Sequence, residues 1–236
     1  MSDILTMVWK ESKDVLFQGG WRSLIRPLFV IGIMGIYLPL QFGPQWVALT
    51  PIGMLLLLWI PFFVVISFIG DAIAGERERH TLETLLASRM PDRSILLGKI
   101  VATVLYAWGM GILSLLLGLV LVDLLRTQGN WMFYPLDLFV DALVLILLAS
   151  VLATSAGVLI SLRVSTVRQA QQILSVGTIV FVFGVTFALR ALPANIVSSL
   201  TYPQFLLSAM VVLAVLDAIL LGLSLVSFQR SRLILS

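Results

Sequence analysis

The sequence contains no cysteine and only one histidine. Without cysteine the chain cannot form a disulfide, use a thiol as a nucleophile or bind a metal through thiolates. Charged residues make up 11% of the 236 residues, whereas about 25% is usual for a soluble domain. This is too little charge to cover a surface that faces water, so the composition excludes an ordinary soluble protein.

Apolar residues take the place of the missing charge: they make up 60% of the chain, and the mean hydropathy is +1.08. A helix needs about 20 apolar residues to cross about 30 Å of hydrocarbon. Runs of this kind lie at residues 27–42, 51–70, 97–122, 138–162, 172–192 and 204–228. We therefore predict an all-α membrane protein with six transmembrane helices, the second of them kinked near Pro61.

Lysine and arginine are divided unevenly between the connections of these runs. Thirteen of the fifteen lie in the N-terminal segment, the 71–99 connection, the 163–171 connection and the C-terminal tail. Cytoplasmic loops carry the excess of basic residues, so we expect a multi-pass protein of the inner or plasma membrane with both termini in the cytoplasm. The predicted single transmembrane domain, 1–236, has an N-terminal segment at 1–26, spans one and two within 27–70, a cytoplasmic loop at 71–99, spans three to six within 97–228 and a cytoplasmic tail at 229–236.

The N-terminal segment has apolar residues at roughly helical spacing, with charged residues between them. Such a pattern next to a span is typical of an amphipathic helix that lies in the membrane interface. A loosely structured charged tail is the alternative. We see no short apolar run followed by a small-residue cleavage site, so we expect the N-terminus to be retained rather than removed as a signal peptide.

The outer connections are short. Residues 123–137 contain Trp131, Phe133 and Tyr134, which suit a membrane–water interface. The 190–204 segment is too apolar for a free loop and is predicted to be a short helix in the outer leaflet or a re-entrant piece. At the cytoplasmic side, Asp92 follows Pro91 and is a candidate cap for the third span.

The 71–99 connection contains a short amphipathic pattern. Four apolar residues, Leu82, Leu85, Leu86 and Met90, recur on one face of a helix. Thr81 is a candidate N-cap, and Pro91 stops the pattern. The alternating charges of Glu76, Arg77, Glu78 and Arg79 favour specific pairing. The apolar face can dock in the groove of a partner or lie against the underside of the spans, and spacing alone leaves both open.

A resemblance separates these two possibilities. The run Glu-Arg-Glu-x-x-Thr-Leu-Glu-x-Leu-Leu-Ala-Ser followed by Pro-x-x-Arg-x-Ile-Leu-Leu-Gly-Lys resembles the cytoplasmic loop of ABC-2 type transporter permeases, which lies between their second and third spans. It covers Glu76 to Lys99 of this chain, and His80 departs from it by replacing the usual glycine. The resemblance implies a coupling helix whose contacts to an ATPase partner are Glu76, Arg77, Glu78, Arg79, Thr81, Leu82, Glu83, Leu85, Leu86, Arg89, Met90 and Pro91.

The resemblance also implies the composition of the assembly. Two permease subunits, identical or different, would combine with two nucleotide-binding subunits, and residues 3–24 would form the family's amphipathic N-terminal helix. The chain has no Gly-x-x-x-x-Gly-Lys-Ser/Thr phosphate loop. We therefore expect no enzyme activity and no cofactor on this chain, with ATP and Mg on the partner. Lipid is a further expected partner, and nucleic acid is not.

Asp217 is a candidate polar site within the membrane, because it lies near the middle of the last apolar run. A carboxylate at that depth should face protein or water rather than lipid. It can serve transport, pair between subunits or form a structural hydrogen bond. A metal site is not expected, since His80 and Glu83 have no second histidine to join them.

We predict a permease subunit of an ATP-binding-cassette transporter that works by alternating access driven by a separate ATPase, with export favoured over import. One alternative is a proton-coupled secondary transporter that uses Asp217. Against it, one carboxylate makes a thin proton relay and no inverted repeat is visible. Another alternative is a membrane anchor of an assembly complex that transports nothing.

Overall fold

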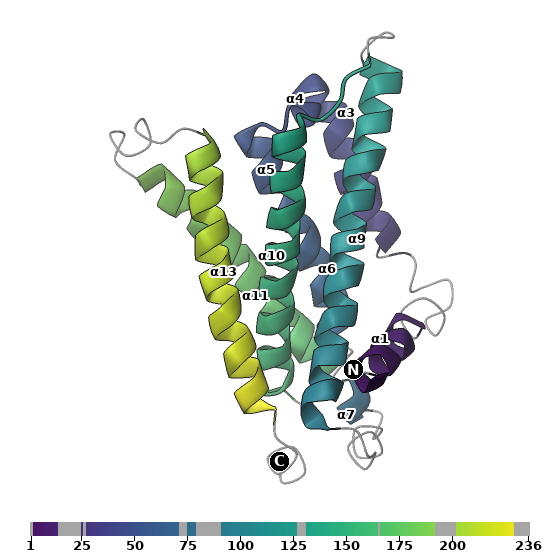
Figure 1. Ribbon diagram of the computed structural model, residues 1–236, viewed down its shortest axis with the longest axis vertical. Coiled ribbons are helices and arrows are strands. Elements are labelled where there is room, and N and C mark those ends of the chain that lie inside the picture. The colour runs from purple at the N-terminus through teal and green to yellow at the C-terminus, as the bar shows by residue number, and fades with distance from the viewer. Residues whose placement is uncertain are drawn as a thin grey trace.

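A computed structural model describes residues 2–13, 25, 27–70, 75–78, 91–126, 131–164, 166–191 and 202–228. Within these ranges every regular element is a helix, and they form one elongated bundle (Figure 1). This confirms the predicted all-α class. Helices cover each of the six apolar runs, but only three of the described helices are both long and apolar enough to cross a membrane, namely those at Arg93–Leu125, Leu136–Ser161 and Tyr202–Ser227.

The second half of the chain forms long helices. These are α9 (Asp92–Arg126), α10 (Leu136–Ser161), α11 (Val167–Ala191) and α13 (Tyr202–Ser227). Pro91 stands directly before α9 and Pro135 before α10, where a fixed φ and a missing N–H do no harm. The prediction that Asp92 caps α9 is wrong by one residue, because Asp92 is already the first helical residue and Pro91 precedes it.

Proline and glycine break the first half of the chain into shorter helices. The apolar helix Pro27–Phe42 contains the π-helix η2 (Ile31–Tyr37) and ends in α3 (Leu38–Phe42). The short helix α4 (Pro44–Val47) leads to α5 (Pro51–Leu57) and α6 (Trp59–Gly70). The break between α5 and α6 falls at Leu58. Pro61 has no N–H to donate to the carbonyl of Leu57. The kink predicted near Pro61 is therefore this break between the two helices.

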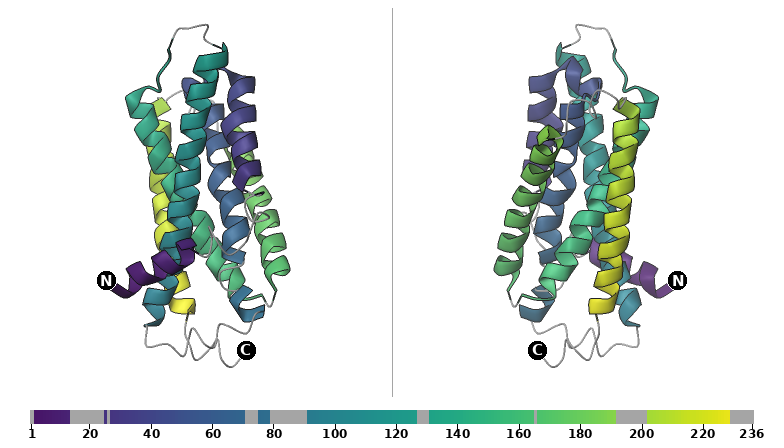
Figure 2. Two further views of the ribbon diagram at one scale, coloured as in Figure 1. Left: turned by 90° about the vertical axis from the view of Figure 1, so that its right-hand side faces the viewer. Right: turned by 90° about the vertical axis from the view of Figure 1, so that its left-hand side faces the viewer.

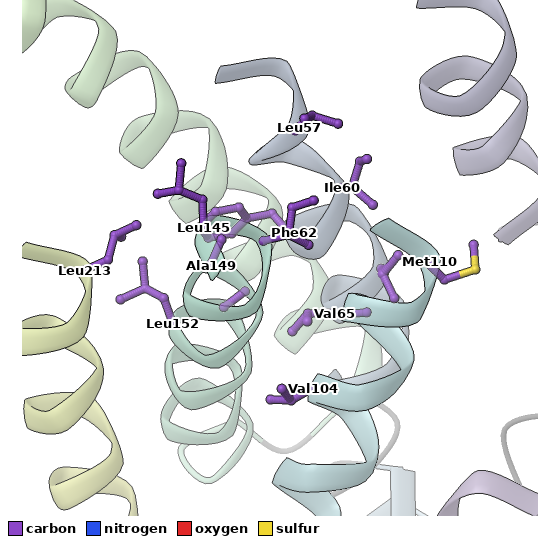
Figure 3. Packing of buried hydrophobic residues seen from close by; sticks show 14 of the residues in the cluster. Leu57, Ile60, Phe62, Val65, Val104, Met110, Leu145, Ala149, Leu152 and Leu213 are labelled. Atoms are coloured by element: carbon purple, nitrogen blue, oxygen red, sulfur yellow. The ribbon is translucent and has the colours of Figure 1, made fainter. Parts of the chain in front are cut away.

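The bundle is built around α9 and α10. α6 and α10 pack against α9, and α13 packs mainly on α10, whereas α11 packs on α6 and α10. α1 (Ser2–Lys13) lies crosswise over the first part of α9, as the two side views show (Figure 2). The core between these helices is apolar, and Phe62 and Val65 of α6, Val104 of α9 and Leu145 of α10 all contribute to it (Figure 3).

The helices alternate in direction, so the bundle has two distinct ends (Figure 1). The α1 end holds α1, the three-residue α7 (Glu76–Glu78), the starts of α9 and α11 and the ends of α10 and α13. The α4 end holds α3, α4 and the opposite helix ends. The predicted segregation of charge requires basic residues at this end. Those that the structure describes there include Lys10, Lys13, Arg93, Lys99, Arg163 and Arg168.

At the α4 end, the hydroxyl groups of two tyrosines donate hydrogen bonds to backbone carbonyls. Tyr134 Oη donates to Leu115 O at 2.9 Å, and Tyr202 Oη donates to Leu49 O at 2.8 Å. Trp131 and Phe133 are exposed, as an interfacial position predicts, but Tyr134 turns inward because its hydroxyl finds this acceptor in α9. Burial raises the pKa of Tyr134 above its ordinary value, so the hydroxyl remains a neutral donor.

Candidate functional site

The predicted coupling loop is described at its two edges. Residues 75–78 precede it, and Pro91 with the start of α9 follows it. The predicted contacts Arg79, Thr81, Leu82, Glu83, Leu85, Leu86, Arg89 and Met90 lie outside the described residues, as does His80. Pro91 is exposed, and the structure describes the backbone of Arg77 but not its side chain. Glu76 and Glu78 are therefore the predicted charged contacts whose side chains the structure describes.

Glu76 joins the loop to α9 and to α1. Its Oε1 lies 3.0 Å from the Nζ of Lys99 and 3.9 Å from the Nζ of Lys10. Lys99 also donates to Oε1 of Glu11, at 2.7 Å. One ammonium group thus holds two carboxylates that are far from it in sequence. We call Glu11, Glu76 and Lys99 the charge cluster of the α1 end.

Lys99 is the buried member of the charge cluster. Its side chain is 2% exposed, whereas those of Glu11 and Glu76 are 13% and 16% exposed. An ammonium group taken out of water is costly unless opposite charges and hydrogen bonds replace its hydration. Both carboxylates supply these. The cluster therefore fixes α1 and the start of the loop on α9, at the point where the loop ends and the long helix begins.

Glu78 joins the loop to a different helix. Its Oε1 accepts a hydrogen bond from the backbone N–H of Val167, at 2.9 Å, across 89 positions of sequence. Val167 is the first residue of α11, and Thr166 Oγ1 accepts from Gln169 N at 3.2 Å in the same turn. The first N–H groups of a helix have no partner within the helix, and the helix dipole favours an anion there. Glu78 therefore acts as a cap supplied by another segment.

Glu76 and Glu78 are two residues apart, yet they attach one segment to three helices. A displacement of this segment would act on α1 and α9 through Glu76 and on α11 through Glu78. The arrangement has no nucleophile paired with a base. It also lacks a group of three or more metal-ligating side chains anywhere in the described ranges.

Asp217 is buried in α13, with 5% of its surface exposed, and neither carboxylate oxygen has a hydrogen-bond partner among the described residues. Two turns further along α13, Ser224 Oγ donates to Ser155 O of α10 at 3.3 Å. Asp217 is thus buried among the described helices, and its predicted role in transport, subunit pairing or a structural hydrogen bond stays a prediction. Asp137 and Asp141, at the start of α10, are exposed and half-buried, which fits interfacial solvation.

Two apolar cavities lie between α6, α10, α11 and α13. Their volumes are about 310 and 370 Å³, and Phe62, Phe181 and Leu216 line both of them. Thr178 of α11 is one of the few polar residues on their walls. Of three phenylalanines in α11, Phe181 lines these cavities, while Phe183 and Phe187 are exposed.

The roles of Lys99 and Glu11 were missed by sequence reasoning. Lys99 was recognised only as part of a motif, and Glu11 only as one charge of an amphipathic segment. A signal was present: Lys99 is the single charged residue between Arg93 and Asp123, inside an otherwise apolar run. An isolated cation in such a run needs an acidic partner, because leaving it unpaired is costly. Sequence does not say which of the twelve acidic residues it pairs with.

The long apolar helices of the described residues fit a membrane-embedded protein. The family model of the ABC-2 family transporter proteins matches residues 29–223, and the chain belongs to this family. Members of it are transmembrane subunits of ABC transporters. The search of curated proteins found no match.

Proposed function

We propose that this chain is the permease subunit of an ABC transporter, with six spans, and that a separate ATPase drives it from the α1 end. The observation that carries the proposal is the attachment of Glu76 and Glu78 to α1, α9 and α11 at the edge of the predicted coupling loop. A helix that docks on a partner needs a firm connection to the bundle it moves. The family match to residues 29–223 supports the same role.

The charge distribution supports a cytoplasmic α1 end. Cytoplasmic connections carry the excess of Lys and Arg, and the described basic residues gather at that end. ATP and Mg would be bound by the partner, because the chain lacks a phosphate loop. A second permease subunit, the same or different, would complete the pore. In this proposal the chain lies in the cell membrane with both termini in the cytoplasm, which the distribution of basic residues supports.

The mechanism has three steps. Nucleotide brings two ATPase subunits together beneath the bundle. The coupling loop, including Leu85 and Leu86, carries that movement to the bundle through the charge cluster and Glu78. The helices then shift as rigid bodies between two packings, one open to each side of the membrane. Outward transport is the proposed direction, since export is favoured in the family the loop resembles.

The proposal is tested by co-purification. Leu85→Glu and Leu86→Glu place a charge on the apolar face that is proposed to dock in the ATPase. We expect loss of the ATPase from the purified complex and unchanged insertion of the permease in the membrane. Trp131→Glu is the matched control, because Trp131 is an exposed apolar residue at the α4 end. Undiminished co-purification of both loop variants would contradict the docking role.

The proton-driven alternative predicts transport without ATP. Asp217 is buried without a hydrogen-bond partner among the described residues, so nothing in this part of the chain forms a proton relay with it. Transport in vesicles with a pH gradient and no ATP would support that alternative, and transport that requires ATP would support the permease. If hydrolysis can be blocked without loss of function, the non-transporting anchor is favoured instead.

A further inference from the structure

The contact between Glu78 and Val167 bridges two parts of the bundle that the backbone does not join directly. α6 and α9 flank the 71–91 segment, so any movement of that segment reaches them through the chain itself. α11 starts 89 positions after Glu78, and α9 and α10 lie between them in the sequence. The hydrogen bond from Val167 N to Glu78 Oε1, at 2.9 Å, connects the loop to α11 without passing through α9 or α10.

α11 forms one wall of the two apolar cavities. Gly177, Thr178 and Phe181 of α11 line the cavity of about 310 Å³, with Leu216 and Ile219 of α13 on its other side. α11 packs mainly on α6 and α10, and α13 packs mainly on α10. No described contact of comparable extent holds α11 to α13. The width of the cavities therefore depends on where α11 stands relative to α13.

We propose that Glu78 is a positioning residue that makes α11 follow the coupling loop, so that the ATPase cycle changes the width of the cavities between α11 and α13. This inference rests on the proposed function and extends it to a helix that the loop does not continue into. The carboxylate acts through its hydrogen bond to the backbone N–H of Val167. This N–H has no partner within its own helix, and the helix dipole favours an anion there. Glu76 serves α1 and α9 and cannot replace it.

Distance measurement between two spin labels tests the inference. The chain has no cysteine, so cysteines introduced at Val180 of α11 and Val215 of α13 are the only labelling sites on it. Both side chains are exposed, at 66% and 55%. The labelled permease is expressed and purified with its ATPase partner in vesicles. The distance is measured without nucleotide and after trapping with ATP and vanadate.

Two variants remove the same hydrogen bond from opposite sides. Glu78→Ala removes the acceptor, and Val167→Pro removes the donor at the first helical position, where proline is tolerated. We expect both to lose at least half of the nucleotide-dependent change in distance. Val167→Pro, which leaves the Glu78 side chain in place, should keep the nucleotide-free distance, the bound ATPase and its hydrolysis. The double variant should lose no more than either single one. Glu78→Gln keeps an oxygen acceptor and should keep most of the change.

The outcomes separate this inference from the proposed function. An unchanged distance response in Glu78→Ala and Val167→Pro would overturn the role of Glu78 and leave the ATPase-driven permease intact. Loss of the ATPase from Glu78→Ala but not from Val167→Pro would also overturn it, since Glu78 would then bind the partner and not α11. If the parent protein binds no ATPase or shows no response to nucleotide, the proposed function itself fails.

Discussion

Gly98 of α9 lies so close to Met7 of α1 that a Cβ atom on Gly98 would stand 2.6 Å from both the Cβ and the Cγ of Met7. Real side chains do not approach so closely, and the carbonyl oxygen of Ile4 is 3.5 Å away on the same side. Met7 is almost completely buried. The missing side chain of Gly98 therefore lets α1 lie directly on α9, one residue before Lys99 binds Glu11.

Gly98→Ala should move α1 away from α9. Overpacking of this kind costs about 1–3 kcal/mol, which outweighs the gain of about 0.5–1 kcal/mol from replacing a helical glycine by alanine. We expect faster protease cleavage within α1 and a lower melting temperature. Gly109→Ala, on the same helix with nothing within 4 Å of its Cβ position, is the control and should be neutral or stabilising. Equal behaviour of the two variants would contradict the close contact.

Lys99→Met should release α1 and the start of the loop together. It removes the ammonium that pairs with both Glu11 and Glu76, and leaves Glu76 with its longer ion pair to Lys10. Breaking a buried pair costs about 3–5 kcal/mol, and the partial exposure of both carboxylates places the expected loss near the lower end of that range. Thermal unfolding in detergent measures the loss. Lys99→Arg keeps the charge and should lose less.

Glu11→Gln in the Lys99→Met background tests whether the pair acts as a unit. Residues in direct contact show interaction energies of about 0.5–3 kcal/mol in double-mutant cycles. We expect the double variant to be less destabilised than the sum of the single variants. Strict additivity would mean that the 2.7 Å contact between Lys99 and Glu11 contributes nothing.

Asp217→Leu should stabilise the bundle. A carboxyl group near the centre of a transmembrane helix costs about 2.5–3.5 kcal/mol on insertion scales, and the described part of the chain offers it no hydrogen bond in return. We expect a higher melting temperature for Asp217→Leu and a smaller increase for Asp217→Asn, which keeps a polar group. A lower melting temperature for Asp217→Leu would show that the carboxyl is satisfied by a group outside the described residues.

The helices and their order could be predicted from the sequence, because long apolar runs and the position of proline are local properties. The run at 97–122 lies within one long helix, and the runs at 138–162 and 204–228 each match one long helix that ends a single residue earlier. The two-sided distribution of Lys and Arg likewise matched the two ends of the bundle. The first two runs were harder, since Pro27–Phe42 and Gly53–Ile66 are shorter helices and the π-helical turns of Ile31–Tyr37 have no clear sequence signal.

The contacts of the candidate site could not be predicted, because they join residues 23, 88 and 89 positions apart. The sequence marked the Glu-Arg-Glu run as important but did not assign Glu76 to Lys99 or Glu78 to Val167. The second contact uses a backbone N–H, which every residue but proline has, so no side-chain pattern reveals it. Tyr134 was placed at the interface for its amphipathic ring, whereas a carbonyl of α9 binds its hydroxyl.

The pairing of Glu11 with Lys99 sets an order for the biogenesis of the protein. These residues are 88 positions apart, so at roughly 5–20 residues per second the ribosome adds Lys99 about 4–18 s after Glu11. During that interval Glu11 lacks the lysine it binds in the finished bundle, and Met7 lacks the surface that buries it. α1 therefore cannot reach its final place before the start of α9 has been synthesised.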